Sequence, residues 1–508
     1  MLNVKELVIT DYQHDLVLVN LLSFTLNSGE KIAIIGSEGS GKSTLLNVIK
    51  GEMPSFTSIR GDIVRPNVIA HMKQNIRYQY KDSSVEDFLF SEPYFRHHYY
   101  DNVVKLSTLF NLNYEEIKFR NIDSFSGGEC VKIALIQCLM IEPDMLLLDE
   151  PSNDLDFKTL LFLESFLQET TIPTLFISHD QRLLENVATG IIHLQHIRKF
   201  TAAKTTFLRV NYQTYKEQFF AKHHSDLMIA HKQRGDYQKK MEKFRQIYQK
   251  VEYQQDQAVR DPVTARLLKK KIHSLKSQQK RYEKEKENFV EIPEMEEPID
   301  IRFNYEEKSN ARRMILDVDW EHIAMPNKHS VGPITLSVKG MDKIVIVGDN
   351  GVGKTTLLRY FIGRLIQTGI RVGYLSQNYS DLLSPKETPV GYIMKHSRLD
   401  SESKIRQNLG ALGLKQNEML YPFEKLSEGT KLKVLLMQLT NNAYDVLVLD
   451  EPTRNISPIN QDELYLLFAR FNGAIIAVTH DRSFIEAVFD KIYKLDQTGL
   501  HEMTLEDH

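Results

Sequence analysis

At 508 residues, with 42% hydrophobic and 26% charged residues and a formal net charge of −3, the chain is too long for one hydrophobic core and predicts two to four soluble globular domains. No apolar run approaches the roughly 18 residues that a membrane helix needs, and two cysteines are too few for a disulfide framework or a metal cluster. The first ten residues, MLNVKELVIT, lack the basic and apolar regions of a signal peptide, so we expect a cytoplasmic protein.

The first motif is a glycine-rich loop, GSEGSGKS, that follows a predicted apolar strand and opens a predicted helix. It matches G-x-x-x-x-G-K-[ST], in which backbone N–H groups surround phosphates, the lysine meets the β- and γ-oxygens and the hydroxyl holds Mg²⁺. Lys42 and Ser43 take these last two roles. We assign phosphate binding to Gly36, Ser37, Gly39, Gly41, Lys42, Ser43 and Thr44.

Three more polar positions follow predicted strands in the same half of the chain. Gln74 ends a short strand and suits a contact to water and Mg²⁺. The apolar run MLLLDE is typical of a buried parallel strand with acids at its carboxyl end. Asp149 would bind Mg²⁺ through water, and Glu150 would polarise an attacking water. His179 follows a further strand and is assigned a γ-phosphate contact.

A basic segment of different composition occupies the middle of the chain. Residues 216–287 hold 19 lysines and arginines against 10 acids, a net charge of +9, which leaves −12 for the remainder. Apolar residues recur at spacings of three and four, and RDPVTA interrupts them. We predict two antiparallel helices joined at residues 260–265, the first about 40 residues and so about 60 Å long. A net charge of −3 by itself suggests no nucleic-acid partner, but this basic exterior suits a phosphate backbone.

The motifs of the first half return in the second half, so the chain is a tandem repeat. The Asp-Glu and His motifs recur 301 residues later, as Asp450, Glu451 and His480. The second phosphate loop, GDNGVGKT, assigns phosphate binding to Gly348, Asp349, Gly351, Gly353, Lys354, Thr355 and Thr356. Thr355, Gln377 and Asp450 are the second set of Mg²⁺ contacts, equivalent to Ser43, Gln74 and Asp149.

With SFSGGE at residues 124–129 and KLSEGT at residues 425–430, these motifs resemble the ATP-binding cassette (ABC) superfamily over about 400 residues. The resemblance implies two α/β cassettes that bind ATP and Mg²⁺ in a head-to-tail sandwich. Each ATP would lie between the phosphate loop of one half and the Ser-Gly-Gly loop of the other, here called the signature loop. The signature contacts would be Ser126, Gly127, Gly128, Ser427 and Gly429.

One of the two implied sites departs from the family pattern. Glu428 replaces the first glycine of the second signature loop, and Ser457 stands where the first half has Asp156. A carboxylate about 5 Å from a phosphate repels it by several kcal/mol at an effective dielectric of about 20; if the side chain points outward, the loop is only stiffer. Site one (Lys42 and Glu150 with the altered loop) should therefore differ from site two (Lys354 and Glu451 with Ser126), although neutral drift in a tolerant loop would leave the same pattern.

Two cassettes, no membrane part and a charged helical hairpin between them resemble the ABC-F family. This resemblance implies a monomer that binds the ribosome at the tRNA exit site, contacting large-subunit rRNA and exit-site or P-site tRNA, with the hairpin tip towards the peptidyl-transferase centre. The long linker and the modest segment 75–123 favour its antibiotic-resistance branch. DNA and membranes are not expected partners. The RNA-binding candidates are Arg260, Arg266, Lys269, Lys270, Lys271, Lys276, Lys280 and Arg281.

The predicted domains are a first cassette at residues 1–211, the basic hairpin at 212–290 and a second cassette at 291–508. Two other functions stay open. A housekeeping or regulatory ribosome ATPase would share every motif without protecting against drugs, and a soluble ATPase subunit of a transporter would share the cassettes without needing the basic hairpin. A hairpin that is only a solvated spacer also fits its lysine-rich faces.

Overall fold

In the computed structural model the chain forms two compact units, one of Met1–Tyr212 with Glu296–His508 and the other of Gln213–Met295. Both copies of the repeat lie in the first unit. The limits of the two cassettes within it remain predictions. The described residues are 1–74, 80–91, 99–153, 155–197, 202–257, 262–290, 301–303, 311–324, 330–397, 401–454 and 456–503.

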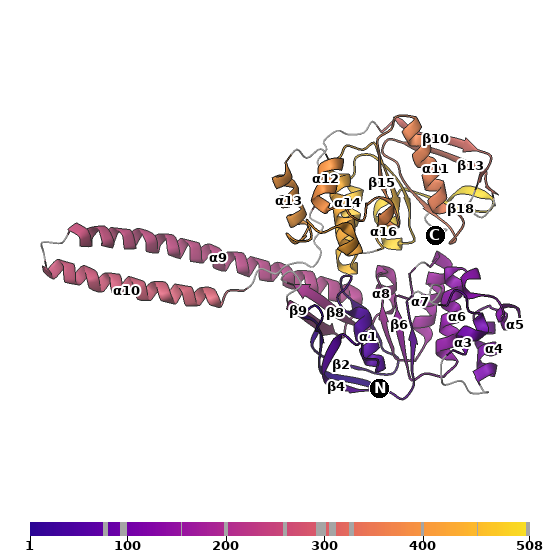
Figure 1. The fold of residues 1–508 in the computed structure, drawn as a ribbon, viewed down its shortest axis with the longest axis horizontal. Coiled ribbons are helices and arrows are strands. Elements are labelled where there is room, and N and C mark those ends of the chain that lie inside the picture. The colour runs from indigo at the N-terminus through magenta and orange to yellow at the C-terminus, as the bar shows by residue number, and fades with distance from the viewer. Residues whose placement is uncertain are drawn as a thin grey trace. The chain divides into compact units, whose positions relative to one another are not determined.

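The first copy, coloured indigo to magenta in Figure 1, is built on a six-stranded sheet. The order of its strands is β5-β6-β7-β3-β8-β9. Its neighbouring strands are parallel except for the β8–β9 pair. The strands are β3 (Lys31–Ile35), β5 (Ile69–Met72), β6 (Met145–Asp149), β7 (Thr174–Ile177), β8 (Gly190–Ile197) and β9 (Ala202–Leu208). Every residue of β3, β6 and β7 is buried, as expected for parallel strands covered on both faces.

The other elements of the first copy surround this sheet. A smaller antiparallel sheet has the order β2-β1-β4, with β1 (Leu2–Asp11), β2 (Leu16–Leu26) and β4 (Thr57–Val64). The helices are α1 (Lys42–Lys50), α3 (Val85–Leu89), α4 (Tyr99–Leu109), α5 (Tyr114–Ile117), η1 (Ile122–Ser124), α6 (Gly127–Leu139), α7 (Phe157–Glu169) and α8 (Gln181–Val187).

The second copy repeats the sheet order, as β15-β16-β17-β14-β18-β19, with only β18 and β19 antiparallel. Its strands are β14 (Lys343–Val347), β15 (Val372–Leu375), β16 (Val446–Asp450), β17 (Ala474–Val478), β18 (Lys491–Asp496) and β19 (Gly499–Met503), with β10 (Met314–Trp320) pairing β13 (Ile334–Lys339) and β11 (Ile323–Ala324) pairing β12 (Ser330–Val331). Its helices are α11 (Lys354–Gln367), η3 (Tyr379–Asp381), α12 (Pro389–His396), α13 (Glu402–Ala411), η4 (Phe423–Lys425), α14 (Glu428–Asn441), η5 (Pro458–Asn460), α15 (Gln461–Ala469) and α16 (Arg482–Val488).

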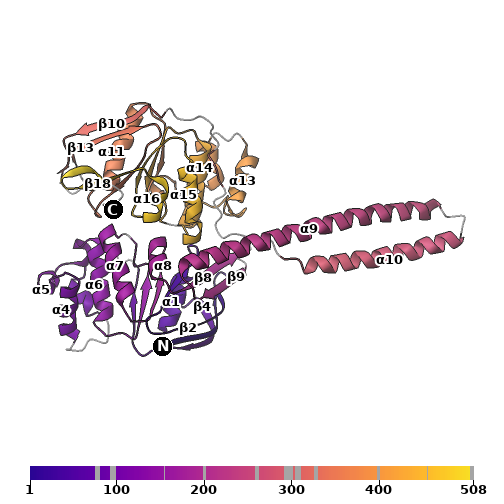
Figure 2. The ribbon, with the colours of Figure 1, turned by 180° about the vertical axis from the view of Figure 1, so that it is seen from behind.

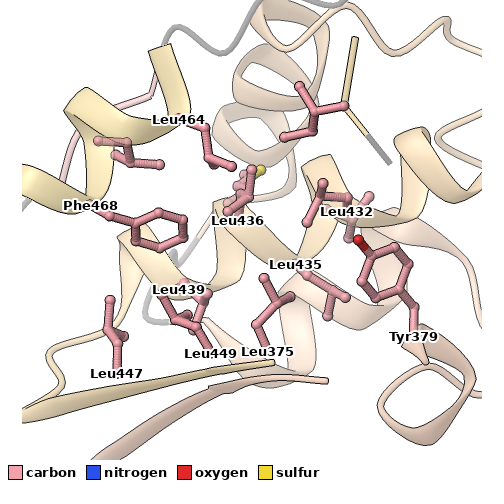
Figure 3. Packing of buried hydrophobic residues seen from close by; sticks show 14 of the residues in the cluster. Leu375, Tyr379, Leu432, Leu435, Leu436, Leu439, Leu447, Leu449, Leu464 and Phe468 are labelled. Carbon is pink, nitrogen blue, oxygen red and sulfur yellow. The ribbon is translucent and has the colours of Figure 1, made fainter. Parts of the chain in front are cut away.

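Helix α14, which begins in the second signature loop, is anchored by a leucine-rich face. Figure 3 shows Leu435 and Leu439 of this helix beside Leu449 and Leu447 of β16 and near Phe468 of α15. These five side chains are buried. Because a packed core fixes the direction of a helix, this contact positions the loop at the helix start. The predicted fold class, α/β with two tandem ABC-type P-loop ATPase domains and a long antiparallel helical hairpin, is confirmed.

The hairpin consists of α9 (Tyr212–Gln257) and α10 (Pro262–Glu287), which lie side by side in Figures 1 and 2. Phe244, Val251 and Leu275 form its buried core, and Met241, Tyr248, Leu268 and Ile272 pack against them. At 46 residues, α9 is longer than the predicted 40 and spans about 70 Å. No described helix is both long and apolar enough to cross a membrane.

The predicted joint at residues 260–265 is wrong in its second half. Pro262 does not interrupt a helix, because α10 begins at this residue. A proline fits the first helical position, where its missing N–H has no helical partner to lose. Residues 262–265 therefore belong to α10, and residues 258–261, including Arg260, lie outside the described residues.

Candidate active sites

The first phosphate loop connects the end of β3 to the start of α1. Gly41 caps the helix with φ of 91°, a left-handed conformation that glycine adopts without strain. The Lys42 ammonium lies over the loop and donates to the carbonyl oxygens of Gly36 at 2.9 Å and Ser37 at 2.8 Å. The loop borders a cavity of about 390 Å³. This cavity is lined by Asp11, Leu18, Glu38, Gly39, Gly41, Lys42, Ser43, Thr44, Phe56, Gln74, Glu150, Asn153, His179 and Arg454.

The second phosphate loop has the same geometry between β14 and α11. Gly353 caps α11 with φ of 105°, and Lys354 Nζ donates to Gly348 O at 2.6 Å and to Asp349 O at 3.1 Å. Burial lowers the pKa of Lys354, although the nearby Glu451 opposes this. The adjoining cavity is larger, about 1180 Å³. The predicted residues that line it are Ser126, Asp349, Gly351, Gly353, Lys354, Thr355, Thr356, Gln377, Asp450 and Glu451.

The acids at the strand ends have oxygen atoms that fit a hard cation. Asp149 Oδ1 and Asp450 Oδ2 are buried and make no hydrogen bond. Burial raises the pKa of Asp149 to about 6, while the Ser43 hydroxyl opposes this; the pKa of Asp450 is raised for the same reason and opposed by Thr355. No three His, Cys, Asp or Glu of the described residues are placed to hold a metal alone. These carboxylate, hydroxyl and amide oxygens therefore fit Mg²⁺ that shares its coordination with phosphates.

Glu150 is held by three side chains of its own copy. Gln74 Nε2 donates to Glu150 Oε2 at 2.7 Å, the Asn153 amide donates to the same oxygen, and His179 Nε2 lies 3.6 Å from Oε1. Burial would raise the pKa of Glu150, but the hydrogen bond and charge of His179, with Lys42 and Asn153, lower it to about 2. Glu150 is therefore a firmly ionised and well-oriented carboxylate.

Glu451 sits in a different electrostatic environment. Its backbone has φ of 49°, close to the 51° of Glu150, so both glutamates adopt a left-handed conformation that is strained for this residue type. His480 Nε2 is 4.0 Å from Glu451 Oε1. Burial raises the pKa of Glu451, which the charge of Lys354 only partly offsets. The two glutamates therefore differ in basicity even though their backbones match.

Segments of the two copies meet at His179. Its Nδ1 lies 3.1 Å from the carbonyl oxygen of Ile456, and Gln461 Nε2 donates to His179 O at 2.9 Å. Because a carbonyl oxygen can only accept, Nδ1 donates a hydrogen to Ile456 O, while Nε2 faces the Glu150 carboxylate. Arg482 also pairs with Glu164 at 2.8 Å, from the second copy to the first. The histidine is thus oriented by the loop that follows the other copy's Asp-Glu motif.

The signature loops cap α6 and α14 through their serines. Ser126 accepts from Glu129 N in a capping box, and Ser427 accepts from Thr430 N. Gly128 approaches α7 so closely that an added Cβ would lie 2.2 Å from Thr159 Oγ1. In each loop the serine is exposed and the glycine two residues later is buried.

The side chain of Glu428 turns towards its own helix, where a lysine neutralises its charge. Its carboxylate pairs with Lys431 Nζ at 2.6 Å, and the exposed fractions of the two side chains are 39% and 14%. The first copy has Gly127 and Cys130 at these two positions. The departure from the family pattern at Glu428 therefore adds an ion pair to this loop. On the other side of the same loop, Gly429 N donates to Glu38 Oε2 of the first phosphate loop at 3.2 Å.

Sequence reasoning missed several residues that the structure brings to the first cavity. Asn153, Glu38 and Arg454 carry no motif signal of their own, since only a comparison of the two copies singles them out. Strands β5 and β15 end at Met72 and Leu375, two residues before Gln74 and Gln377.

The described RNA-binding candidates are all exposed on α10, namely Arg266, Lys269, Lys270, Lys271, Lys276, Lys280 and Arg281.

Comparison with known proteins agrees with this geometry. Residues 19–153 and 331–454 match the family model described as ABC transporter. The ATP-binding protein Uup of Buchnera aphidicola (subsp. Acyrthosiphon pisum, strain APS) is 28% identical over 94% of this chain and 78% of its own length. The ribosome protection protein VmlR of Bacillus subtilis (strain 168) is 26% identical over 94% of this chain and 84% of its own length.

A third relative, ABC transporter F family member 4 of Arabidopsis thaliana, is 30% identical over 74% of this chain and 52% of its own length. Among solved structures, the complex of the archaeal ribosomal stalk protein aP1 and the archaeal ribosome recycling factor aABCE1 matches with a TM-score of 0.63 and 17% identity. That match covers 99% of this chain and 90% of the other. At this identity the likeness shows the fold alone.

Proposed function

We propose, from the premise that the chain belongs to the ABC transporter family and is a tandem-cassette ATP hydrolase of the ABC-F type, that it binds ribosomes in its ATP state and leaves after hydrolysis. The name of one relative, ribosome protection protein, supports a ribosomal partner, and the match with that relative covers 94% of this chain. ABC ATPase domains generally bind ATP with Mg²⁺, and the assigned residues of both sites fit that pair.

The chemistry follows from the two glutamates and the groups around them. Lys42 and Lys354 would bind the β- and γ-phosphate oxygens, and Mg²⁺ when bound would neutralise phosphate charge. Glu150 or Glu451 would accept a hydrogen bond from water and orient it for attack on the γ-phosphorus. A new bond forms from the water oxygen to phosphorus, the bond to the ADP oxygen breaks, and the water's proton leaves through the carboxylate or the phosphate.

The exposed basic face of the hairpin is the observation that carries the ribosomal proposal. The seven RNA-binding candidates of α10 are exposed, as are Lys284 and Lys286, while Leu268, Ile272 and Leu275 pack in the core of the hairpin. Among the described residues, none of the seven candidates has an ion-pair partner. Each cation that meets an RNA phosphate releases a counterion, so such a surface binds RNA with an affinity that falls steeply with salt. A spacer would need only the apolar seam.

Neutralising the hairpin tests this interface. Lys269→Gln, Lys270→Gln and Lys276→Gln together should weaken ribosome binding and lower the slope of log affinity against log salt by about two, because each lost phosphate contact removes roughly 0.7 to 0.9. The matched control is Lys105→Gln, Lys339→Gln and Lys404→Gln, which removes the same charge from exposed positions outside the hairpin. Equal losses of ribosome affinity in the two triple variants would indicate a nonspecific effect of charge. The hairpin would then be rejected as the contact with the ribosome.

The finer proposal is that the protein acts at the tRNA exit site, with the hairpin tip towards the peptidyl-transferase centre, and protects translation from antibiotics. Its support is the ribosome protection relative. The Uup relative, of similar identity, is named only as an ATP-binding protein and adds no support for drug protection. Arg266→Ala, at an exposed position near the start of α10, should change drug tolerance while ribosome binding and ATP hydrolysis persist. Unchanged inhibitory concentrations in Arg266→Ala, Arg260→Ala and Val263→Ala would select the housekeeping function.

A further inference from the structure

The two sites differ in charge at several equivalent positions. Site one has Glu38, Glu428 and Arg454 where site two has Asn350, Gly127 and Asn153. Site two has Asp349 and Asp156 where site one has Ser37 and Ser457. Acids therefore occur in both sets, and the guanidinium of Arg454 is the one cation among these positions.

Arg454 belongs to the second copy but borders the cavity of the first phosphate loop. It follows β16 and the Asp-Glu motif, and its backbone N–H points to Glu451 O at 3.5 Å. Its side chain is exposed, and it lines the cavity of about 390 Å³ together with Lys42, Glu150 and His179. The neighbouring Ile456 accepts from His179, so this loop is held against the first copy on both sides of residue 455.

The same position has a different role in the first copy. Asn153 donates to the carboxylate of Glu150 in its own copy. Arg454 borders the cavity of the other copy's phosphate loop, whereas Asn153 does not line the cavity of the second phosphate loop.

A cation beside Glu38 would favour phosphate binding at site one. Glu38 accepts from Gly429 N, which is a donor that a bound phosphate would otherwise receive at the start of α14. Glu428 is neutralised by Lys431, but Glu38 lines the cavity together with the acids Asp11 and Glu150. A guanidinium offers planar, paired N–H donors that match phosphate oxygens.

We propose that Arg454 is a phosphate-binding residue of site one, supplied by the second copy, which binds the nucleotide held by Lys42 and offsets the carboxylate of Glu38. Site two takes no corresponding cation, because Asn153 stands at the equivalent position. Site one would thus hold ATP across the two copies through Arg454, in place of the usual reliance on the signature loop.

The test measures nucleotide affinity one site at a time, with magnesium and a slowly hydrolysed ATP analogue and with no ribosomes present. The Lys354→Ala background disables site two and reports on site one, while Lys42→Ala does the reverse. In the Lys354→Ala background, Arg454→Asn should weaken binding about 10- to 100-fold, as expected for losing a charge-assisted phosphate contact. Arg454→Lys should recover part of that loss, and in the Lys42→Ala background the change should stay within about twofold.

Arg470→Asn, an exposed arginine at the end of α15 outside both cavities, controls for general loss of charge. The inference is overturned if Arg454→Asn leaves site one unchanged, if it weakens both sites alike, or if Arg470→Asn matches it. Because the assay needs only ATP binding, its failure is separate from a failure of ribosome binding.

Discussion

Removing Lys431 should expose the charge that the altered signature loop carries. In the structure this lysine is 14% exposed and sits 2.6 Å from the Glu428 carboxylate, so it neutralises the acid at the start of α14. Lys431→Ala would leave a carboxylate about 5 Å from the expected γ-phosphate, which costs about 3 kcal/mol per unit charge at an effective dielectric of about 20. Screening over a Debye length of about 8 Å reduces this to about 2 kcal/mol, roughly a 20- to 30-fold loss of ATP affinity at site one.

A double-mutant cycle isolates this effect. In the Lys354→Ala background, Lys431→Ala should weaken binding of the ATP analogue, Glu428→Gly alone should change it by less than about threefold, and the two together should restore it. Titration of a fluorescent analogue at low and high salt provides the measurement, and the loss should shrink at high salt. If Lys431→Ala is harmless, or if its loss persists in the double variant, Glu428 does not face the phosphate and the lysine has another role.

The remaining predictions concern the two sites and acid stability. Glu451→Gln should lower steady-state ATP turnover at least about threefold more than Glu150→Gln. The reason is that Glu150, whose pKa is about 2, is a weaker base than Glu451, whose pKa burial raises. Equal losses of turnover in the two variants would show that the sites are equivalent. His193 is 2% exposed, and burial lowers its pKa to about 3. The imidazole of His193 therefore binds a proton less readily in the folded state than in the unfolded chain. The stability that the neutral imidazole supplies is fully present above pH 6.5 and is lost as pH falls, by about 3 kcal/mol at pH 4. In His193→Gln, the urea midpoint of unfolding should therefore fall less steeply between pH 6.5 and pH 4 than in the unmodified protein. Equal slopes for the two proteins would refute this.

Local sequence patterns were sufficient for the elements that carry the motifs. The two phosphate loops lie between a buried strand and a helix, as predicted, because glycine spacing and apolar runs act within about 15 residues. The spacing of apolar residues in the hairpin also predicted two packed helices, and Phe244, Val251 and Leu275 form the core between them. Pro262 was misplaced because one proline signals a helix start as well as a helix break.

Tertiary contacts could not be obtained in this way. The partner of Glu428 is three residues away, so helical spacing could have suggested Lys431, but the choice between facing phosphate and facing the helix needed coordinates. Arg454 and Ile456 reach the first copy only through the folded arrangement of segments about 300 residues apart. Alignment of the two copies gave the one sequence signal for Arg454, as a charged residue where the first copy has asparagine.

If ATP binding commits the protein to the ribosome, trapping the ATP state should hold the protein there. The variant with both Glu150→Gln and Glu451→Gln should bind ATP but hydrolyse it on the order of 10² to 10⁴-fold more slowly. In ATP it should co-sediment with ribosomes and inhibit translation, whereas the same variant in ADP, or with Lys42→Ala and Lys354→Ala added, should remain in the supernatant. A double variant that binds ATP and still sediments free of ribosomes would show that ATP binding does not commit the protein to the ribosome.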